Sequence, residues 1–182
     1  GVIGLIRFLP PDVAMPDWGQ AMVALGMVSA FFGVLVGITQ AHPKTILACS
    51  SISQMGIVMA VMGLGLAHGN GAGGVALVVA FYGAHHTLVK GGLFLAIGAR
   101  ENRAAAVLIP AAILALGMAG LPLTGGSLAK LALKEPAGYG AVAVLFSLSS
   151  AGTAMLMIHF LRRLSALPVT DRQRGQAAQE MD

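Results

Sequence analysis

Charged residues are scarce in this chain of 182 amino acids, where Asp, Glu, Lys and Arg make up only 10% of the sequence. An average soluble domain has about 25% charged residues, which help to cover a surface that contacts water. This shortage, together with a hydrophobic fraction of 57%, excludes a water-soluble globular protein. Cysteine is nearly absent as well. The single Cys49 excludes an internal disulfide and any paired-cysteine metal or redox site, and we expect it to pack between helices.

The sequence also lacks the motifs of common catalytic and cofactor sites. No glycine-rich phosphate loop, metal motif or nucleophile elbow is present, and the ten methionines are not clustered at ligand spacing. The net charge of +4 comes from scattered basic residues that form no patch for nucleic acid. We therefore expect no cofactor, no metal and no nucleic-acid partner for this chain.

Long apolar runs occupy most of the sequence instead. A membrane-spanning helix needs about 20 apolar residues, whereas the strands of a transmembrane barrel are shorter and alternate. The runs therefore predict an all-α, polytopic helical membrane protein with about five full spans preceded by a half-span. The half-span covers residues 1–9, and the full spans cover residues 20–40, 44–66, 75–99, 104–134 and 138–161.

The fourth span contains a predicted helix break at residues 120–126. One proline and three glycines fall within this stretch: Gly120, Pro122, Gly125 and Gly126. Proline and glycine disfavour a continuous α-helix, and a break at membrane depth is tolerated only where protein or water satisfies the freed backbone groups. The alternative is that the span ends near Pro122 and is followed by an interfacial helix that carries Lys130 and Lys134.

Basic residues predict the orientation of the spans. With five full spans, seven basic residues fall on one side of the membrane and two on the other, and cytoplasmic loops are the ones enriched in Lys and Arg. The larger group is Lys44, Arg100, Arg103, Arg162, Arg163, Arg172 and Arg174, and the smaller group is Arg7 and Lys134. We expect a transmembrane domain over residues 1–164 and a polar, mobile tail over residues 165–182 on the cytoplasmic side of a bacterial inner membrane.

The start of the chain gives no sign of a cleavable signal peptide. Its first apolar stretch is too short for one and meets Pro10 and Pro11. The first residue is Gly1 and not Met, so we expect a fragment or a processed product.

Polar residues in the middle of the third apolar run are the most informative feature. Tyr82, His86 and Lys90 are spaced by four and therefore share one helix face, with His85 about 100° around the helix. Ionisable groups near the bilayer centre are costly, and they usually face a bundle interior or a water path. An imidazole titrates at about pH 6.5, so this pattern favours a proton relay. The alternative is a hydrogen-bonded helix contact without a transport role.

Other polar residues are weaker candidates. Lys130 follows the predicted break, where a lysine can exchange protons with an aqueous half-channel. Ser50 and Gln54 share a face of the second full span, and with Ser53 they could hold water in a proton path. Packing between helices is favoured for each of these three alone, and for His159 near the edge of the last span a structural role is favoured.

Three ordered stretches resemble motifs of the antiporter-like, proton-translocating membrane subunits of respiratory complex I. The same family includes subunits of multisubunit sodium/proton antiporters and of membrane-bound hydrogenases. The stretches are KTILACSSISQMG at residues 44–56, HTLVKGGLFLA at residues 86–96 and GLPLTGGSLAK at residues 120–130. The resemblance covers roughly residues 1–164, which would correspond to the C-terminal half of the family fold.

This resemblance implies roles for particular residues. Lys130 would match the lysine of a discontinuous helix near the proton exit, and His86 and Lys90 would match relay groups along a central hydrophilic axis. The sequence departs from the family pattern at three positions. Tyr82 stands where many members have a second histidine, for which His85 could substitute. Cys49 replaces a tyrosine and Ser127 replaces a phenylalanine.

From these features we expect a proton-translocating membrane subunit of a redox-driven complex similar to NADH:quinone oxidoreductase. The chain has no redox site of its own, so any enzymatic activity would belong to the assembly. Its expected partners are other membrane subunits, the lipid bilayer and protons. One alternative is a subunit of a multisubunit sodium/proton antiporter, which would also handle sodium. A second alternative is a structural membrane subunit that transports nothing.

Overall fold

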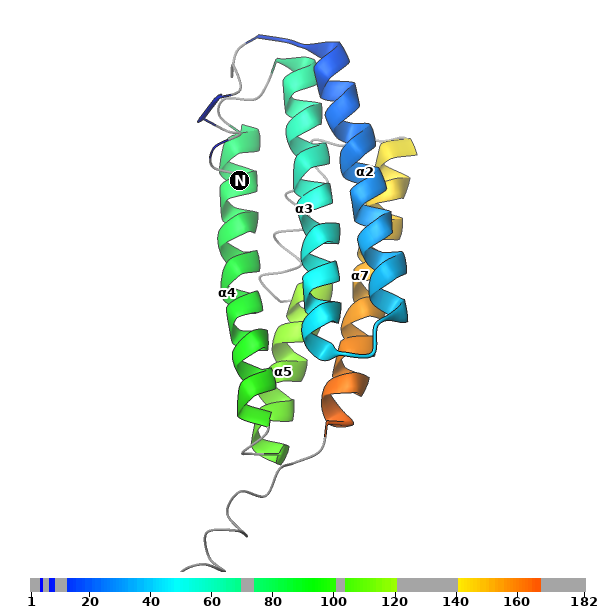
Figure 1. Ribbon diagram of the computed structural model, residues 1–182. Helices are drawn as coiled ribbons and strands as arrows, with labels where there is room; N and C mark the ends of the chain where they lie inside the picture. Colours follow the sequence, from blue (N-terminus) through cyan, green and yellow to red (C-terminus); the bar gives the residue numbers. More distant parts are fainter. Residues whose placement is uncertain are drawn as a thin grey trace, which may run out of the picture.

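The computed structural model describes six parts of the chain, and within them the long elements are all α-helices. The described residues are 4, 7–8, 13–69, 74–100, 104–120 and 141–167. The helices are α2 (Pro16–Thr39), α3 (Pro43–His68), α4 (Ala76–Arg100), α5 (Ala104–Ala119) and α7 (Ala141–Ser165). They lie side by side as a bundle in which α3 runs opposite to α2, α4 and α7 (Figure 1). The predicted all-α class is confirmed for this part of the chain.

Three of these helices are long and apolar enough to cross a membrane: Pro16–Thr39, Pro43–His68 and Val142–Ser165. Helix α4 has a similar length of 25 residues, but Tyr82, His85, His86 and Lys90 interrupt its apolar sequence. Helix α5 comprises 16 residues. The predicted count of about five full spans is therefore not confirmed. These same polar residues lower the mean hydropathy of α4, and α4 is not among the three candidate spans.

Proline and glycine set the helix boundaries. Pro16 and Pro43 occupy the first turns of α2 and α3, where a missing N–H costs no helical hydrogen bond. Gly69 ends α3 with a φ of 68°, a left-handed conformation that glycine adopts without strain. Helix α5 ends at Ala119 and is followed by Gly120, whose φ is 90°. This is where the predicted break begins, but the rest of it, including Pro122, Gly125 and Gly126, lies outside the described residues.

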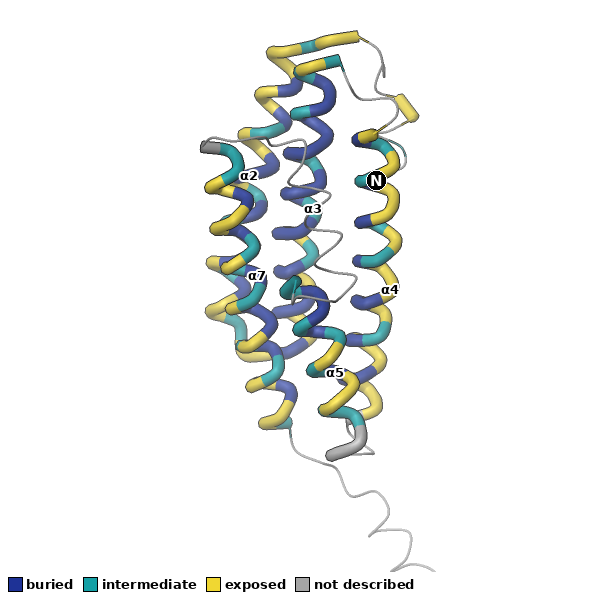
Figure 2. The backbone as a smooth tube through the Cα atoms, turned by 180° about the vertical axis from the view of Figure 1, so that it is seen from behind, coloured by how far each residue is buried: buried dark blue, intermediate teal, exposed yellow. Residues whose placement is uncertain are grey.

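Many large apolar side chains are exposed on the outside of the bundle, and several polar side chains are buried inside it. Figure 2 shows the buried residues of α4 on the side that faces α3. Large apolar residues such as Leu35, Leu88, Leu95 and Ile109 are exposed. This distribution suits a hydrocarbon environment, in which exposed apolar side chains incur no cost and polar groups must find partners within the protein.

Helices α2 and α3 form the closest pair in the bundle, because glycines line their contact. Gly19, Gly26 and Gly33 recur every seven residues on α2 and face Gly63, Gly56 and Ser53 on α3. A Cβ atom added at Gly26 would lie 2.5 Å from the carbonyl oxygen of Gly56, and one added at Gly63 would lie 2.6 Å from that of Gly19. Small residues at such positions let helix backbones approach each other in membranes.

We predict that Gly26→Ala destabilises the protein by about 1–3 kcal/mol, because the new methyl group meets backbone atoms that cannot move aside. Thermal unfolding of the detergent-solubilised protein measures the effect. Gly83→Ala on α4 is the matched control, since a Cβ there meets nothing within 4 Å. Equal melting temperatures for the two variants would contradict the close α2–α3 contact.

Candidate functional site

Seven polar or charged residues are buried in the described part of the bundle. They come from three helices: Ser50, Ser53 and Gln54 on α3, His86 and Lys90 on α4, and Ser149 and Thr153 on α7. A buried polar group is costly unless it is hydrogen-bonded, so these residues are where the chain departs from simple apolar packing. We refer to these seven residues as the polar cluster.

Lys90 joins α4 to α3. Its side chain is only 5% exposed, and its Nζ donates hydrogen bonds to the carbonyl oxygen of Leu47 and to Ser50 Oγ. Ser50 Oγ in turn donates to the same Leu47 carbonyl over 2.9 Å. The ammonium group is therefore held by neutral oxygen atoms of the neighbouring helix.

No carboxylate is available on the surrounding helices to balance the charge of Lys90. The sequences of α3, α4, α5 and α7 contain no Asp or Glu. A buried ammonium group without a counter-ion is expensive, and hydroxyl and carbonyl dipoles offset only part of that cost. The charge of Lys90 therefore contributes little to the stability of the fold.

Helix α4 brings two more predicted residues to the same buried face. The rings of Tyr82 and His86 are stacked, with centroids 6.3 Å apart and planes 20° apart. His86 lies one helical turn from Lys90, and its Nδ1 has no hydrogen-bond partner among the described residues. His85 lies beside this face and is only partly buried. Tyr82, His86 and Lys90 thus form a buried row on one helix, as their spacing predicts.

Helix α7 contributes two buried residues that the sequence reasoning missed. Gln54 Nε2 donates a 2.6 Å hydrogen bond to Thr153 Oγ1, and Thr153 Oγ1 donates to the carbonyl oxygen of Ser149 over 3.0 Å. Ser149 and Thr153 are spaced by four within an apolar run, as Ser50 and Gln54 are. The same spacing rule applied to this helix could have found them.

Two other predicted residues are not part of the polar cluster. His159 is partly buried, and its Nε2 lies 2.8 Å from the carbonyl oxygen of Gln40, at the turn after α2. This contact ties the C-terminal part of α7 to the turn between α2 and α3. Lys130 lies outside the described residues.

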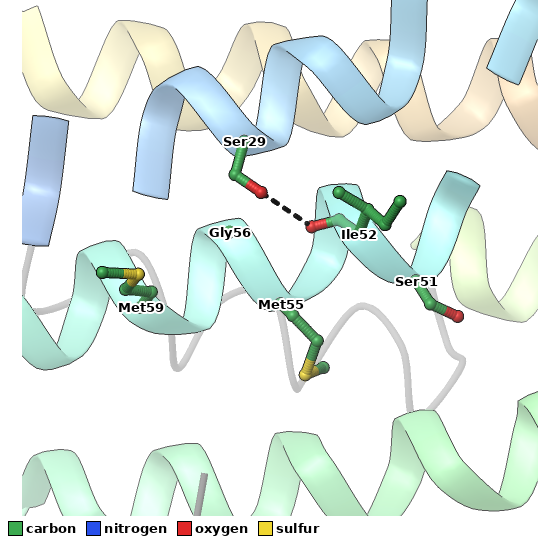
Figure 3. A pocket seen from close by; sticks show the side chains of 6 residues that line it. All are labelled: Ser29, Ser51, Ile52, Met55, Gly56 and Met59. Atoms are coloured by element: carbon green, nitrogen blue, oxygen red, sulfur yellow. Dashed lines mark hydrogen bonds between the residues drawn. The ribbon is translucent and has the colours of Figure 1, made fainter. Parts of the chain in front are cut away.

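An open groove of about 380 Å³ lies between α2 and α3, apart from the polar cluster. It is lined by Ser29, Ser51, Ile52, Met55, Gly56 and Met59, and Ser29 Oγ donates to the carbonyl oxygen of Ile52 over 3.5 Å (Figure 3). The lining is mostly apolar and contains no ionisable group. The groove therefore offers no chemistry of its own.

Comparison with known proteins identifies the family. The sequence profile described as NADH:quinone oxidoreductase/Mrp antiporter, TM, matches residues 1–156. The chain belongs to this family. The resemblance seen in the sequence motifs is therefore confirmed, and the apolar helices are those of an integral membrane protein.

Several similar proteins are named as subunits of sodium/proton antiporters. The Na(+)/H(+) antiporter subunit A1 of Staphylococcus aureus strains JH9, Newman and N315 is 29% identical to the chain over 174 residues. The match covers 84% of the chain but only 22% of each relative, so the chain spans about a fifth of the length of these proteins. No solved structure matches the chain.

We predict that Lys90→Met leaves the melting temperature unchanged or raises it, because an apolar side chain of similar length removes a buried charge that has no carboxylate partner on α3, α4, α5 or α7. Ser50 keeps its hydrogen bond to Leu47 in this variant. The control is Lys44→Met, which removes an exposed lysine from α3. A marked loss of thermal stability in Lys90→Met alone would mean that the ammonium group is a structural anchor.

Proposed function

We propose that this chain is a proton-conducting part of an antiporter-like subunit in a multisubunit sodium/proton antiporter, corresponding to the C-terminal half of the family's transmembrane fold. The observation that carries the proposal is the ammonium group of Lys90, which is buried between α4 and α3 and which, among the described residues, bonds to neutral oxygens alone. The names of the relatives favour an antiporter over a redox-driven complex.

In this proposal, Lys90 and His86 pass protons along the buried face of α4. The ammonium group of Lys90 can release a proton, because neutral oxygens stabilise its charge less well than a carboxylate would. His86, one turn away, has an Nδ1 without a partner in the described part of the chain, and this atom can accept or donate through an intervening water. Tyr82 stacks on the imidazole of His86 and thereby fixes its orientation.

Lys130 completes the proposed path. The family resemblance implies that it lies on a discontinuous helix near the proton exit, beyond Pro122, Gly125 and Gly126. Protons would pass from Lys90 to this lysine and from there to one side of the membrane. We further propose a bacterial inner membrane, a cytoplasmic C-terminal tail over residues 165–182, and other membrane subunits as partners.

A redox-driven complex is the second candidate, because the family description itself joins NADH:quinone oxidoreductase with Mrp antiporters. The same lysines and histidine would then carry protons without sodium. The third candidate, a structural subunit, would need none of them to titrate.

Replacing Lys90 or Lys130 with Ala is expected to reduce proton flux at least tenfold without loss of the assembled complex, because each change removes a titratable group from the proposed path. Flux is measured with a pH-sensitive dye in everted membrane vesicles, and assembly by native gel electrophoresis. Lys44→Ala, at an exposed position, is the control. Wild-type flux in both variants would favour a structural subunit and overturn the relay.

Sodium dependence separates the two transport candidates. For an antiporter, adding NaCl to energised vesicles should release the pH gradient, and an equal concentration of choline chloride should not. The Lys90→Ala variant should lose this response. A pH gradient that forms on addition of NADH and keeps the same size when NaCl is added would assign the chain to a redox-driven complex.

A further inference from the structure

The carbonyl oxygen of Leu47 on α3 is surrounded by hydrogen-bond donors. It accepts from Lys90 Nζ, from Ser50 Oγ over 2.9 Å and from Ser51 Oγ over 3.2 Å. Because Leu47 lies inside α3, the backbone N–H of Ser51 is its regular helical partner as well. A carbonyl oxygen has two lone pairs, so this one has more donors beside it than it can fully satisfy.

Ser50 differs from the other side-chain donors of α3 because it also contacts the charged group. Its Oγ donates to the Leu47 carbonyl and accepts a hydrogen bond from Lys90 Nζ. Ser51 donates to the same carbonyl, but it lines the open groove between α2 and α3, and no hydrogen bond joins it to Lys90 in the described part of the bundle. Ser50 is fully buried, so its hydroxyl depends on partners within the protein.

The hydroxyl of Ser50 can bond to Lys90 in both protonation states of the lysine. A serine hydroxyl has one donor and two acceptor lone pairs, and its hydrogen rotates to suit its surroundings. Towards an ammonium group, which has donors only, Ser50 acts as the acceptor. A neutral amine has a lone pair, to which the hydroxyl hydrogen of Ser50 can turn. The Leu47 carbonyl then keeps its other donors, so no buried acceptor loses all its partners.

We propose that Ser50 is a positioning residue for proton transfer at Lys90, and that its hydroxyl hydrogen turns from the Leu47 carbonyl to Lys90 Nζ when the lysine is deprotonated. In this step one N–H bond of the ammonium group breaks, and the proton passes to the next group of the proposed path, in the direction of Lys130. The electron pair stays on Nζ and accepts the hydrogen bond from Ser50. Reprotonation reverses each change.

This inference rests on the proposed function and adds to it a residue from a second helix. A proton carrier has to be charged and neutralised in every cycle, and in an apolar bundle the loss of a hydrogen bond in either state leaves a buried polar group unsatisfied. A hydroxyl that serves both states avoids this loss. We therefore expect the Ser50 hydroxyl to affect the rate of proton transfer more than the assembly of the complex.

Substitutions at Ser50 and Ser51 of the full-length subunit, within its membrane complex, test the role of the hydroxyl. Ser50→Ala removes the hydroxyl without adding atoms, and Ser51→Ala is the matched control because it removes a hydroxyl from the same carbonyl. Ser50→Thr and Ser50→Val form a second pair. Both side chains branch at Cβ, and only that of threonine has a hydroxyl. Proton flux in everted vesicles is compared per assembled complex.

If the hydroxyl serves Lys90, Ser50→Ala slows proton flux several-fold and Ser51→Ala does not. Ser50→Thr then retains several-fold more flux than Ser50→Val, which a role in packing alone would not produce. Wild-type flux in Ser50→Ala overturns the proposal, and so does equal flux in Ser50→Thr and Ser50→Val. If the two larger variants do not assemble, the comparison between Ser50→Ala and Ser51→Ala decides.

Melting temperatures test the two bonding modes without any transport measurement. A double-mutant cycle combines Ser50→Ala with Lys90→Met and is measured at acidic and at alkaline pH, on both sides of the titration of Lys90. We expect Ser50→Ala to lower the melting temperature more in the presence of Lys90 than in Lys90→Met at both pH values. If this difference is lost at alkaline pH, Ser50 bonds to the ammonium group alone and the turn of its hydroxyl is overturned.

Failure of the proposed function gives a different result. Wild-type flux in Lys90→Ala would mean that the lysine carries no protons, and the proposed function would fail together with the role of Ser50 in transport. The melting-temperature cycle would still decide whether Ser50 bonds to Lys90 in one protonation state or in both.

Discussion

The placement of one positive charge in an apolar bundle constrains the rest of this structure. Lys90 is buried among helices whose sequences contain no Asp or Glu, so oxygen atoms of the backbone and of serine are its bonding partners. Those oxygens belong to α3, which must therefore pack against α4 with Leu47 and Ser50 at the level of the ammonium group. Because hydrocarbon offers no polar partners, such contacts have to come from within the protein. The oxygens that bind the ammonium group and the remaining polar residues of α3 therefore lie together within the bundle.

Two faces of α3 make different kinds of contact: one packs closely against α2, and the other forms hydrogen bonds to α4 and α7. One face carries Gly56 and Gly63, which allow the backbone of α2 to approach closely. The other carries Ser50 and Gln54, which bond to α4 and α7. Interhelical hydrogen bonds in membranes contribute only about 0.6 kcal/mol each, so the glycine contact supplies packing that the polar face cannot. Helix α3 can therefore bond to Lys90 of α4 on one face while its packing against α2 is provided by the other.

Much of this arrangement could be predicted from sequence, and the reasons for the gaps are physical. Spacing by four placed Tyr82, His86 and Lys90 on one face, because helix geometry alone decides that relation. Which helix supplies the partners of Lys90 depends on tertiary packing, and spacing within α4 says nothing about it. Ser149 and Thr153 were missed because two hydroxyls in an apolar run look like ordinary packing residues until Gln54 is seen to reach Thr153. The register of the α2 and α3 glycines likewise emerges only when both helices are in place. The roles assigned to the site residues stay predictions.

The glycine contact between α2 and α3 has a mechanical consequence. Backbone atoms of the two helices already touch at three successive levels, so neither helix can slide or roll past the other without a collision. The loop hydrogen bond from Met15 N–H to the Leu66 carbonyl oxygen, 2.9 Å long, clamps one end of the pair, and His159 braces the other through Gln40. Helices α2 and α3 therefore form one rigid unit of the bundle. Because Lys90 is on α4, outside this pair, a change in the position of its ammonium group relative to α2 and α3 would require a movement of α4 or of the lysine side chain itself.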